Sequence, residues 1–418
     1  MRAQHAAAQR HAPDPLVART VKVSDPGDLV ACLPHPEVVA WLRGGDGLVG
    51  WGEAARLTLP AGADRFAAGQ AWLRELFEAA VIADEVGVPG TGPVAFGSFT
   101  FDPACGGSVL VVPAAVLGRR DGQAWMTTIS GGAGAGLATA STPVTAPAEV
   151  RWSDGSQTAP QWQNAVAAAV ARIRAGELRK VVLARDLHAV ASAPLDMRLL
   201  LARLTARHPG SYTFACAGLT GATPELLVRR VGQEVSSLVL AGTAARGGTP
   251  AEDEALSAAL LASAKDAEEH RYAVDSVREA LGPLCERLEL AAEPELLRLP
   301  DVQHLATPVH GTLAGDASAL ALAAALHPTA AVCGTPTPTA LELIRELEGM
   351  DRGRYTGPVG WVDSRGNGEW GIALRCGEIA GARARIFAGG GIVAASDPAA
   401  ELAEAQAKFR PMRLALES

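Results

Sequence analysis

Runs of strand-forming residues and runs with helical periodicity alternate irregularly along this chain. Before residue 130, glycine and proline clusters separate five strand-like runs, as hairpin connections do. These runs are residues 17–23, 38–42, 48–59, 94–101 and 109–117, and one helix is expected among them at 63–83. The regular strand–helix–strand repeat of a parallel sheet is not seen. The pattern therefore predicts an α+β fold with antiparallel sheets and helices packed outside them.

The second half of the chain carries most of the expected helices. They lie at residues 157–176, 195–208, 250–281, 318–326 and 339–348. Strands are expected at 181–190, 211–217, 226–231, 234–240, 357–362, 369–375 and 384–388, and polar loops at 303–308 and 326–336. The helix at 250–281 is the longest, and its apolar positions recur every three or four residues. Because His270 falls on that apolar stripe, we expect this histidine to be buried.

Length and composition allow two or three domains, or one large one, since a 418-residue chain with 48% hydrophobic residues can bury a large core. Residues 1–15 are predicted to be disordered and residues 16–418 to be folded. The strand-rich part is 16–130, a loop rich in Gly, Ala, Thr and Pro covers 131–156, and the motif-bearing part is 157–418.

Several classes of protein are disfavoured by composition. The net charge of −8 argues against a general nucleic-acid binder. The six cysteines show no Cys-x-x-Cys spacing, which argues against a zinc site or a compact disulfide framework. No apolar run approaches membrane-spanning length, and the N-terminus lacks a signal-peptide core. We therefore expect a cytoplasmic protein that binds neither nucleic acid nor membrane.

Two isolated charged residues have surroundings that suit acid–base chemistry. Lys180 opens an apolar strand, where it is either a solvated strand end or, in a closed cleft, a base whose pKa is lowered by desolvation and nearby cations. Glu225 lies at a turn beside Pro224 and Leu226. It is either an inert turn carboxylate or a buried acid with a raised pKa.

A glycine-rich apolar strand, residues 387–393, leads into a short acidic helix near the C-terminus. Glycines let a backbone pass close to a ligand, and Asp397 followed by Pro398 is a typical helix start. On that helix Glu401, Glu404 and Lys408 share one face. The face is either solvated, as most charged helical faces are, or directed into a cleft.

A second acidic helix supplies a carboxylate beside a buried stripe. Glu269 adjoins the apolar positions of the helix at 250–281. Glu269 and Glu404 could hold one hard cation between two helices, because Mg²⁺ uses one or two protein carboxylates and completes its shell with water and substrate oxygens.

Together these segments resemble the chorismate-utilising enzymes, and within them the isochorismate synthases. The segments that carry the resemblance keep the family's order from about residue 157 to the C-terminus. They are KVVLAR at 180–185, PELL at 224–227, LAGTAAR at 240–246, KDAEEH at 265–270, HLATP at 304–308, HPTAAVCG at 327–334, YTGPVGW at 355–361, GNGEW at 366–370, LRC at 374–376 and FAGGGIV at 387–393. GWGE at 50–53 and FGSFTF at 96–101 are similar to the family's N-terminal part.

The resemblance implies a fold, a substrate and a reaction. The fold is one α/β domain in which two antiparallel sheets form a sandwich with helices around it. The substrate is chorismate, and isochorismate synthases add water at C2 and expel the C4 hydroxyl. By this resemblance Lys180 activates the water and Glu225 protonates the leaving hydroxyl. Glu269 and Glu404 hold Mg²⁺, and Glu401 accepts a hydrogen bond from water near the ion.

The resemblance also implies a set of substrate contacts. Arg375 and Lys408 bind substrate carboxylates, and His304 lies near the ring carboxylate. The remaining contacts are expected from Gly242, Thr243, Tyr355, Leu374 and Gly389.

A few positions separate the subfamilies. Relatives that make anthranilate usually have glutamine where Lys180 stands, and aminodeoxychorismate synthases have lysine where this chain has Ala241. Both positions favour water over ammonia, so no glutaminase subunit is expected, and family members are often monomers. Salicylate-forming relatives usually have threonine in place of Ala331, whereas Tyr355 and Leu374 match the residues that they carry.

Three hypotheses follow. The first is an isochorismate synthase, an isomerase whose product feeds menaquinone or siderophore biosynthesis. The second is a salicylate synthase, which forms isochorismate and then eliminates pyruvate. The third is an inactive chorismate-binding protein, which the presence of the acid, the base and both metal ligands disfavours.

Overall fold

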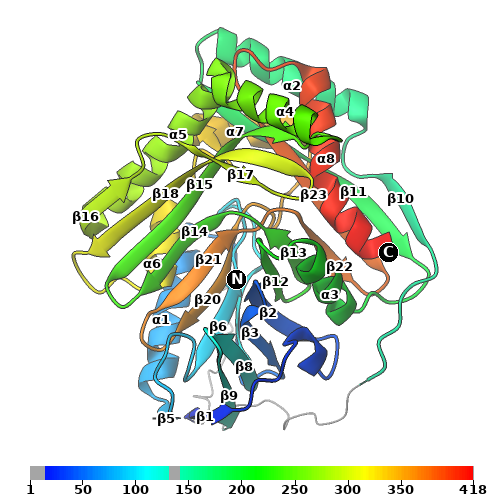
Figure 1. The fold of residues 1–418 in the computed structure, drawn as a ribbon. Helices are drawn as coiled ribbons and strands as arrows, with labels where there is room; N and C mark the ends of the chain where they lie inside the picture. Colours follow the sequence, from blue (N-terminus) through cyan, green and yellow to red (C-terminus); the bar gives the residue numbers. More distant parts are fainter. Residues whose placement is uncertain (1–14, 131–141, 418) are drawn as a thin grey trace, which may run out of the picture.

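The computed structural model describes residues 15–130 and 142–417 (Figure 1). The predicted tail at 1–15 lies outside these residues except for its last position, and so do positions 131–141 of the predicted loop. Within the described residues, the strands form one sheet of 13 strands and one of 10. The predicted fold class, two large sheets with helices around them, is confirmed.

The larger sheet joins the N-terminal and C-terminal parts of the chain. Its order is β10 (Val150–Asp154), β11 (Lys180–Ala191), β23 (Arg383–Ile392), β22 (Cys376–Ala380), β13 (Leu219–Thr223), β12 (Tyr212–Cys216), β2 (Val38–Arg43), β3 (Asp46–Trp51), β8 (Ala115–Arg120), β9 (Gln123–Ser130), β1 (Val17–Val23) and β5 (Val81–Asp84). The short β19 (Gly334–Thr335) pairs with β11 off this path. Among the described pairs of this sheet, β1 with β5 is parallel and the others are antiparallel.

The smaller sheet is antiparallel in every described pair. Its order is β16 (Cys285–Leu290), β18 (Val302–Leu313), β15 (Glu234–Ala245), β14 (Leu226–Val231), β21 (Gly368–Ile372), β20 (Pro358–Asp363), β6 (Val94–Ser98), β7 (Ser108–Val112) and β4 (Ala55–Leu59), with β17 (Glu295–Arg298) paired to β18. The antiparallel prediction is therefore confirmed, apart from the β1–β5 pair.

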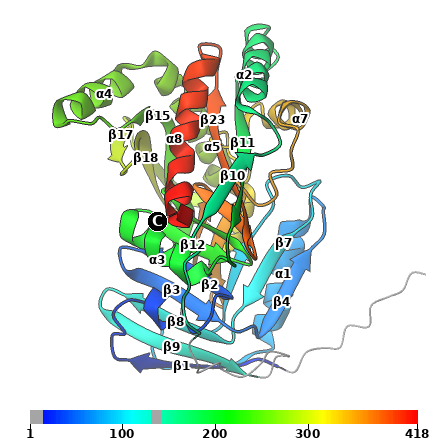
Figure 2. The ribbon, with the colours of Figure 1, turned by 90° about the vertical axis from the view of Figure 1, so that its right-hand side faces the viewer.

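The described helices cover the sheets from outside. They are α1 (Arg65–Glu78), α2 (Ala159–Arg174), α3 (Met197–Arg207), α4 (Pro250–Ala262), α5 (Ala264–Leu281), α6 (Ala319–Leu326), α7 (Thr337–Leu347) and α8 (Pro398–Glu417), with 3₁₀ turns η1 (Val30–Cys32) and η2 (Gly282–Leu284). Figure 2 shows α8 descending to α3, on which its end packs. Among the described helices, none combines the length and apolar character needed to cross a membrane.

The prediction of one long helix at 250–281 is wrong. The segment forms α4 and α5, which meet at Ser263 in extended backbone. The Ser263 hydroxyl accepts a hydrogen bond from the N–H of Asp266 and so caps the start of α5. The longest described helix is instead α8, with 20 residues. His270 is buried, as predicted.

Other predicted segments are divided by their turn residues. The strand expected at 48–59 breaks into β3 and β4 at Gly52, which has φ +66°. The run at 109–117 divides at Pro113 into β7 and the start of β8. The helix expected at 63–83 ends at Glu78, and its last residues form β5.

The segment 303–308, expected to be a polar loop, is part of β18, and all of it is buried except the half-buried Pro308. Its polar side chains are accommodated because they bond to neighbouring elements. The amide oxygen of Gln303 accepts a hydrogen bond of 2.7 Å from Ser257 of α4, and the hydroxyl of Thr307 bonds to His270 of α5, also at 2.7 Å. Further strands that the sequence pattern missed are β5, β9, β10, β13, β16, β17, β19 and β22.

Aromatic side chains fill the space between the two sheets. Trp41 of β2 and Phe214 of β12 share one buried cluster with Phe96 of β6 and Trp361 of β20. Because these strands belong to different sheets, the cluster joins them into a sandwich.

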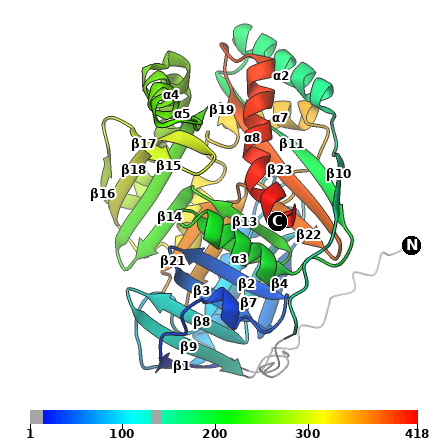
Figure 3. The same ribbon diagram turned by 45° about the vertical axis from the view of Figure 1, so that its right-hand side comes forward.

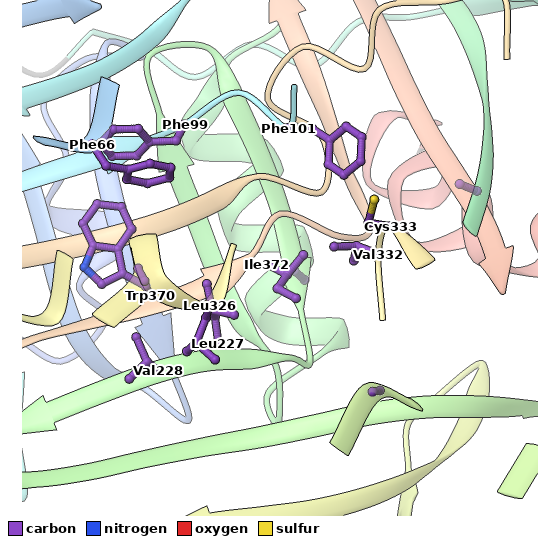
Figure 4. Close-up of a cluster of buried hydrophobic side chains, with 14 of the residues drawn as sticks. Phe66, Phe99, Phe101, Leu227, Val228, Leu326, Val332, Cys333, Trp370 and Ile372 are labelled. Atoms are coloured by element: carbon purple, nitrogen blue, oxygen red, sulfur yellow. The ribbon is translucent and has the colours of Figure 1, made fainter. Parts of the chain in front are cut away.

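A second cluster lies where α1 and α6 cover the smaller sheet. Phe66 of α1 stacks on Phe99 with ring centroids 4.3 Å apart, and Trp370 of β21 lies 5.8 Å from Phe99 (Figure 4). The same buried cluster extends to Leu326 of α6 and to Val332. This packing fixes the loop that follows α6, whose residues reach the pocket described next.

The glycine-rich strand and acidic helix form as predicted. β23 pairs along β11, with Gly391 opposite Val182 and Gly389 opposite Ala184. The Asp397 carboxylate accepts hydrogen bonds from the first turn of α8, which begins at Pro398. Figure 3 shows α8 lying along β23, with β15 and β18 across from them.

Candidate active site

A small cavity of about 60 Å³ lies where β23 and α8 approach β15, β18 and α5. Nine of the predicted site residues line it: Glu225, Thr243, Glu269, His304, Tyr355, Leu374, Arg375, Gly389 and Lys408. They come from segments that are up to 183 positions apart in the sequence, and the two sheets and two helices bring them together.

Lys180 is the first residue of β11, and its side chain is completely buried. Its Nζ lies 3.2 Å from Oε1 of Glu269 on α5. Glu269 lines the cavity, so Lys180 stands directly behind the cavity wall. Of the two alternatives left open by the sequence, the solvated strand end is therefore wrong.

Glu225 lies between β13 and β14 with only 5% of its surface exposed. Burial raises the pKa of this carboxyl to about 8, although the positive charges of Lys180, Arg375 and Lys408 act in the opposite direction. A carboxyl with this pKa is mostly protonated at neutral pH, so it can donate a proton. Glu225 therefore has the burial and the raised pKa that the second alternative expects.

Glycines of β23 let two acidic helices approach the backbone. A Cβ placed on Gly391 would lie 2.0 Å from Oε1 of Glu269, and one on Gly390 would lie 3.7 Å from Oε1 of Glu404. A side chain at position 391 would therefore displace the Glu269 carboxylate, whereas a methyl group at position 390 would be in ordinary van der Waals contact with Glu404. Gly389 is constrained differently, because its Cβ would lie 2.5 Å from the carbonyl oxygen of Leu183 in β11.

Glu269 and Glu404 fit a hard divalent cation as donors. Both offer carboxylate oxygens from facing helices beside the glycine strand, and Mg²⁺ commonly takes one or two such ligands. No group of three or more His, Cys, Asp or Glu residues within 15–130 and 142–417 is arranged to hold a metal. The donor set therefore suits an ion whose shell is completed by water and substrate oxygens rather than a closed protein cage.

Glu401 is more deeply buried than Glu404 and already has partners. Its Oε1 accepts hydrogen bonds of 2.7 Å from Lys265 and from Ser396. Burial raises the pKa of Glu401, with the charge of Glu404 acting in the same direction. Its other oxygen lies 3.0 Å from the position of a Cβ on Gly390.

Arg375 is held in an unusual backbone conformation at the pocket wall. Its φ of +47° is in the left-handed region, which costs a non-glycine residue about 1–3 kcal/mol. Its Nη2 donates to Nε2 of His304 at 3.3 Å, and the His304 Nδ1 lies 3.1 Å from the Thr243 hydroxyl. Burial holds the pKa of His304 well below its usual value, so the ring is neutral and its proton resides on Nδ1.

Lys408 and two aromatic rings complete the wall. The Lys408 ammonium donates to the carbonyl oxygen of Gly389 at 2.9 Å and pairs with Glu404 one turn earlier. Tyr355 stacks on Phe387 of β23 with ring centroids 4.9 Å apart. Gly242 does not line the cavity, but its φ of +75° makes the bend that presents Thr243.

Sequence reasoning did not single out Val182, Leu240, Val332 and Thr356, which line the cavity. Val182 has a signal, because strand alternation places it on the same face of β11 as Lys180. Leu240 lies in β15. Val332 and Thr356 lie in irregular segments, where no periodicity points to them.

Comparisons with known proteins show the family of this chain. A family model described as "Chorismate binding enzyme" matches residues 41–417. The chain belongs to the chorismate-binding enzyme family. Isochorismate synthase DhbC of Bacillus subtilis is 44% identical to this chain over 267 residues, which cover 61% of this chain and 67% of the relative.

Two solved structures of the family are similar over nearly the whole chain. The putative 2,3-dihydroxybenzoate-specific isochorismate synthase DhbC of Bacillus anthracis matches with a TM-score of 0.76 and 32% identity, covering 92% of this chain and 97% of that one. MenF, the menaquinone-specific isochorismate synthase of Escherichia coli, matches with a TM-score of 0.79 and 25% identity, covering 97% and 96%. The resemblance inferred from the motifs is therefore confirmed.

Proposed function

We propose that this chain is a Mg²⁺-dependent isochorismate synthase, which converts chorismate to isochorismate. Membership of the family and the names of its relatives support this activity. The observation that carries the proposal is that a buried lysine and a protonated carboxylic acid meet at one small pocket. Lys180 stands behind the wall and Glu225 lines it.

The two groups suit addition of water at one carbon and loss of hydroxyl at another. Lys180 takes a proton from water while the oxygen bonds to C2 of the ring. The ring double bond shifts, the C4–oxygen bond breaks, and Glu225 gives its proton to the departing oxygen. One water is consumed and one released, so the product is an isomer of the substrate. Positioned proton transfer of this kind contributes about 10²–10⁴-fold in rate.

The remaining polar groups bind the substrate's two carboxylates. Arg375 and Lys408 offer positive charge, and both line the cavity. His304 lies near the ring carboxylate, where its neutral ring adds no competing charge. Thr243 and the backbone at Gly242 and Gly389 supply further hydrogen bonds.

Glu269 and Glu404 would hold the Mg²⁺ ion. When bound, the ion offsets the repulsion between chorismate's carboxylates and these acidic side chains. Glu401 has one oxygen bonded to Lys265 and Ser396, and its second oxygen is left as an acceptor for water near the ion.

The nucleophile is water, and no glutaminase subunit is needed. Lys180 stands where ammonia-using relatives carry glutamine, and Ala241 stands where aminodeoxychorismate synthases carry lysine. We expect a monomeric cytoplasmic enzyme whose product feeds menaquinone or siderophore biosynthesis.

Salicylate formation is the second candidate. Tyr355 and Leu374, which match salicylate synthases, both line the cavity. Ala331 also lines it, where salicylate-forming relatives usually carry threonine. Ala331 favours a reaction that stops at isochorismate.

Product analysis tests the proposal. The protein is incubated with chorismate and millimolar Mg²⁺, and isochorismate, salicylate and pyruvate are separated and quantified over time. We expect isochorismate without stoichiometric pyruvate, and no turnover after chelation of the metal. Rapid release of one pyruvate per chorismate would establish the second candidate, and absence of any chorismate consumption would refute both.

A further inference from the structure

A second, water-sized space adjoins Arg375 on the side of α8 and the β17–β18 turn. It measures about 10 Å³, which matches a single water molecule. Its lining includes His208 and Ser211 from the α3–β12 connection, Asp301 from the turn before β18, and Ala407 from α8. Arg375 lines both this space and the candidate active site.

Two buried polar atoms of this lining have no hydrogen-bond partner among the described residues. They are Nε2 of His208 and Oδ2 of Asp301. A buried polar atom without a partner is destabilising, so two such atoms beside one water-sized space indicate a shared water. His208 is only 5% exposed, which leaves its ring little access to bulk solvent.

Asp301 interacts electrostatically with both Arg375 and His208. Burial lowers the pKa of Arg375, and Asp301 is among the acidic groups that oppose this change. Burial also lowers the pKa of His208, and again Asp301 opposes it. The outer oxygen of Asp301 lies 3.4 Å from Nε of Arg410, whose side chain is largely exposed.

Arg375 needs support on this side. Its left-handed backbone is strained, and within residues 15–130 and 142–417 the one hydrogen bond of its guanidinium to the pocket goes to His304 at 3.3 Å. A long side chain with so few anchors loses affinity for a carboxylate, because binding must then order it.

We propose that Asp301 is a positioning residue for Arg375, acting through one water that it shares with His208, and that it thereby sets the affinity of the pocket for a substrate carboxylate. The identity of that carboxylate rests on the function proposed above. Asp301 touches neither substrate nor reacting atoms, so its loss changes binding rather than chemistry.

The test compares Asp301→Asn with Arg410→Gln. Asp301→Asn keeps the shape of the side chain and removes its charge, and we expect KM for chorismate to rise about tenfold with kcat within twofold of the wild type. Arg410→Gln removes only the exposed partner of Asp301 and is expected to leave both constants unchanged. An unchanged or lowered KM in Asp301→Asn, or an equal change in both variants, overturns the proposal.

A second variant covers the case in which Asp301→Asn fails to fold. Ala407→Val fills the space from α8 and expels the water without touching a polar group, so it should raise KM in the same direction. Unchanged KM in a folded Ala407→Val protein contradicts the role of the water.

A crystal structure separates this inference from the proposed function. The wild-type protein without substrate should show one water within hydrogen-bond distance of Asp301, His208 and Arg375, and Asp301→Asn should show the guanidinium displaced. If the wild type fails to convert chorismate, the proposed function falls and this geometry alone decides the role of Asp301. If it converts chorismate but the water or the displacement is missing, the positioning role falls and the function stands.

Discussion

Two buried ion pairs contact the first half of β11, and they differ in how many of their polar atoms have hydrogen-bond partners. Glu348 and Arg352, in the segment after α7, are both about 2% exposed or less at their side chains. Lys180 and Glu269 are buried at 0% and 11%. The first pair supports the middle of β11, and the second lies at its first residue.

The Glu348–Arg352 pair has partners for nearly all its polar atoms. The guanidinium donates to both Glu348 oxygens and to the carbonyl oxygens of Val332 and Val182. Glu348 also accepts the backbone N–H of Ala184 at 2.7 Å. A buried pair satisfied in this way fixes the strand and leaves no atom available for chemistry.

The Lys180–Glu269 pair is sparsely satisfied by comparison. The ammonium lies 3.2 Å from one carboxylate oxygen and makes no hydrogen bond within the described residues. The two pairs therefore differ in how many of their polar atoms have partners, and the sparsely satisfied pair is the one that lies at the candidate site.

The largest expected effect comes from removing the sparsely satisfied cation. Lys180→Ala should lower kcat by about 10²–10⁴-fold, because the base is lost, while chorismate still binds. Isochorismate formation and calorimetric binding of chorismate measure the two quantities. Arg179→Ala, at the exposed neighbouring position, is the control and should behave as wild type. Near-wild-type turnover in Lys180→Ala would remove this residue from the mechanism.

Breaking the satisfied pair should instead damage the fold. Glu348→Gln leaves the Arg352 charge buried without its carboxylate, and we expect the free energy of unfolding to fall by about 3–5 kcal/mol. Urea unfolding measures this change, and the rate per folded molecule should stay near wild type. Asp275→Asn, which breaks the exposed Arg278–Asp275 pair, should cost no more than about 1 kcal/mol. An equal loss of unfolding free energy in Glu348→Gln and Asp275→Asn would contradict a special stabilising role for the buried pair.

The protonated acid at the pocket predicts a pH dependence. Glu225 must carry its proton to donate it, and its pKa is about 8, so kcat should be sustained below this pH and fall about tenfold per unit above it. A pH–rate profile measures this limb. Glu225→Gln should lower the rate strongly, and its residual rate should lack the limb. A limb that persists unchanged in Glu225→Gln belongs to another group.

The smallest effects concern the glycines beside the carboxylates. Gly391→Ala places a methyl group 2.0 Å from Oε1 of Glu269, so we expect weaker Mg²⁺ binding, by about tenfold. Gly390→Ala meets the flexible end of Glu401 at 3.0 Å and reaches Glu404 only in ordinary contact at 3.7 Å, so it should change Mg²⁺ affinity less. Titration calorimetry with Mg²⁺ alone compares them. A larger loss in Gly390→Ala than in Gly391→Ala would argue against Glu269 as a ligand.

Local sequence signals predicted several structural features correctly. The Asp397–Pro398 start of α8 and the burial of His270 follow from capping chemistry and helical periodicity, which act over a few residues. β18 was misjudged because its polar side chains find partners on α4 and α5, which local patterns do not contain. The break at Ser263 was missed although serine is a common cap, because the apolar stripe continues across it.

The sequence by itself determined the antiparallel α+β class, the family and the residues from which a site could be built, because periodicity, turn chemistry and motif order are written along the chain. Only the tertiary structure decided which charged residues lose their water. It buried Lys180 and Glu225, and it placed Glu269 and Glu404 at one glycine strand. It also set Asp301 and His208 beside Arg375. Burial and distance fix proton affinity and pairing, and both depend on segments that are far apart in the sequence.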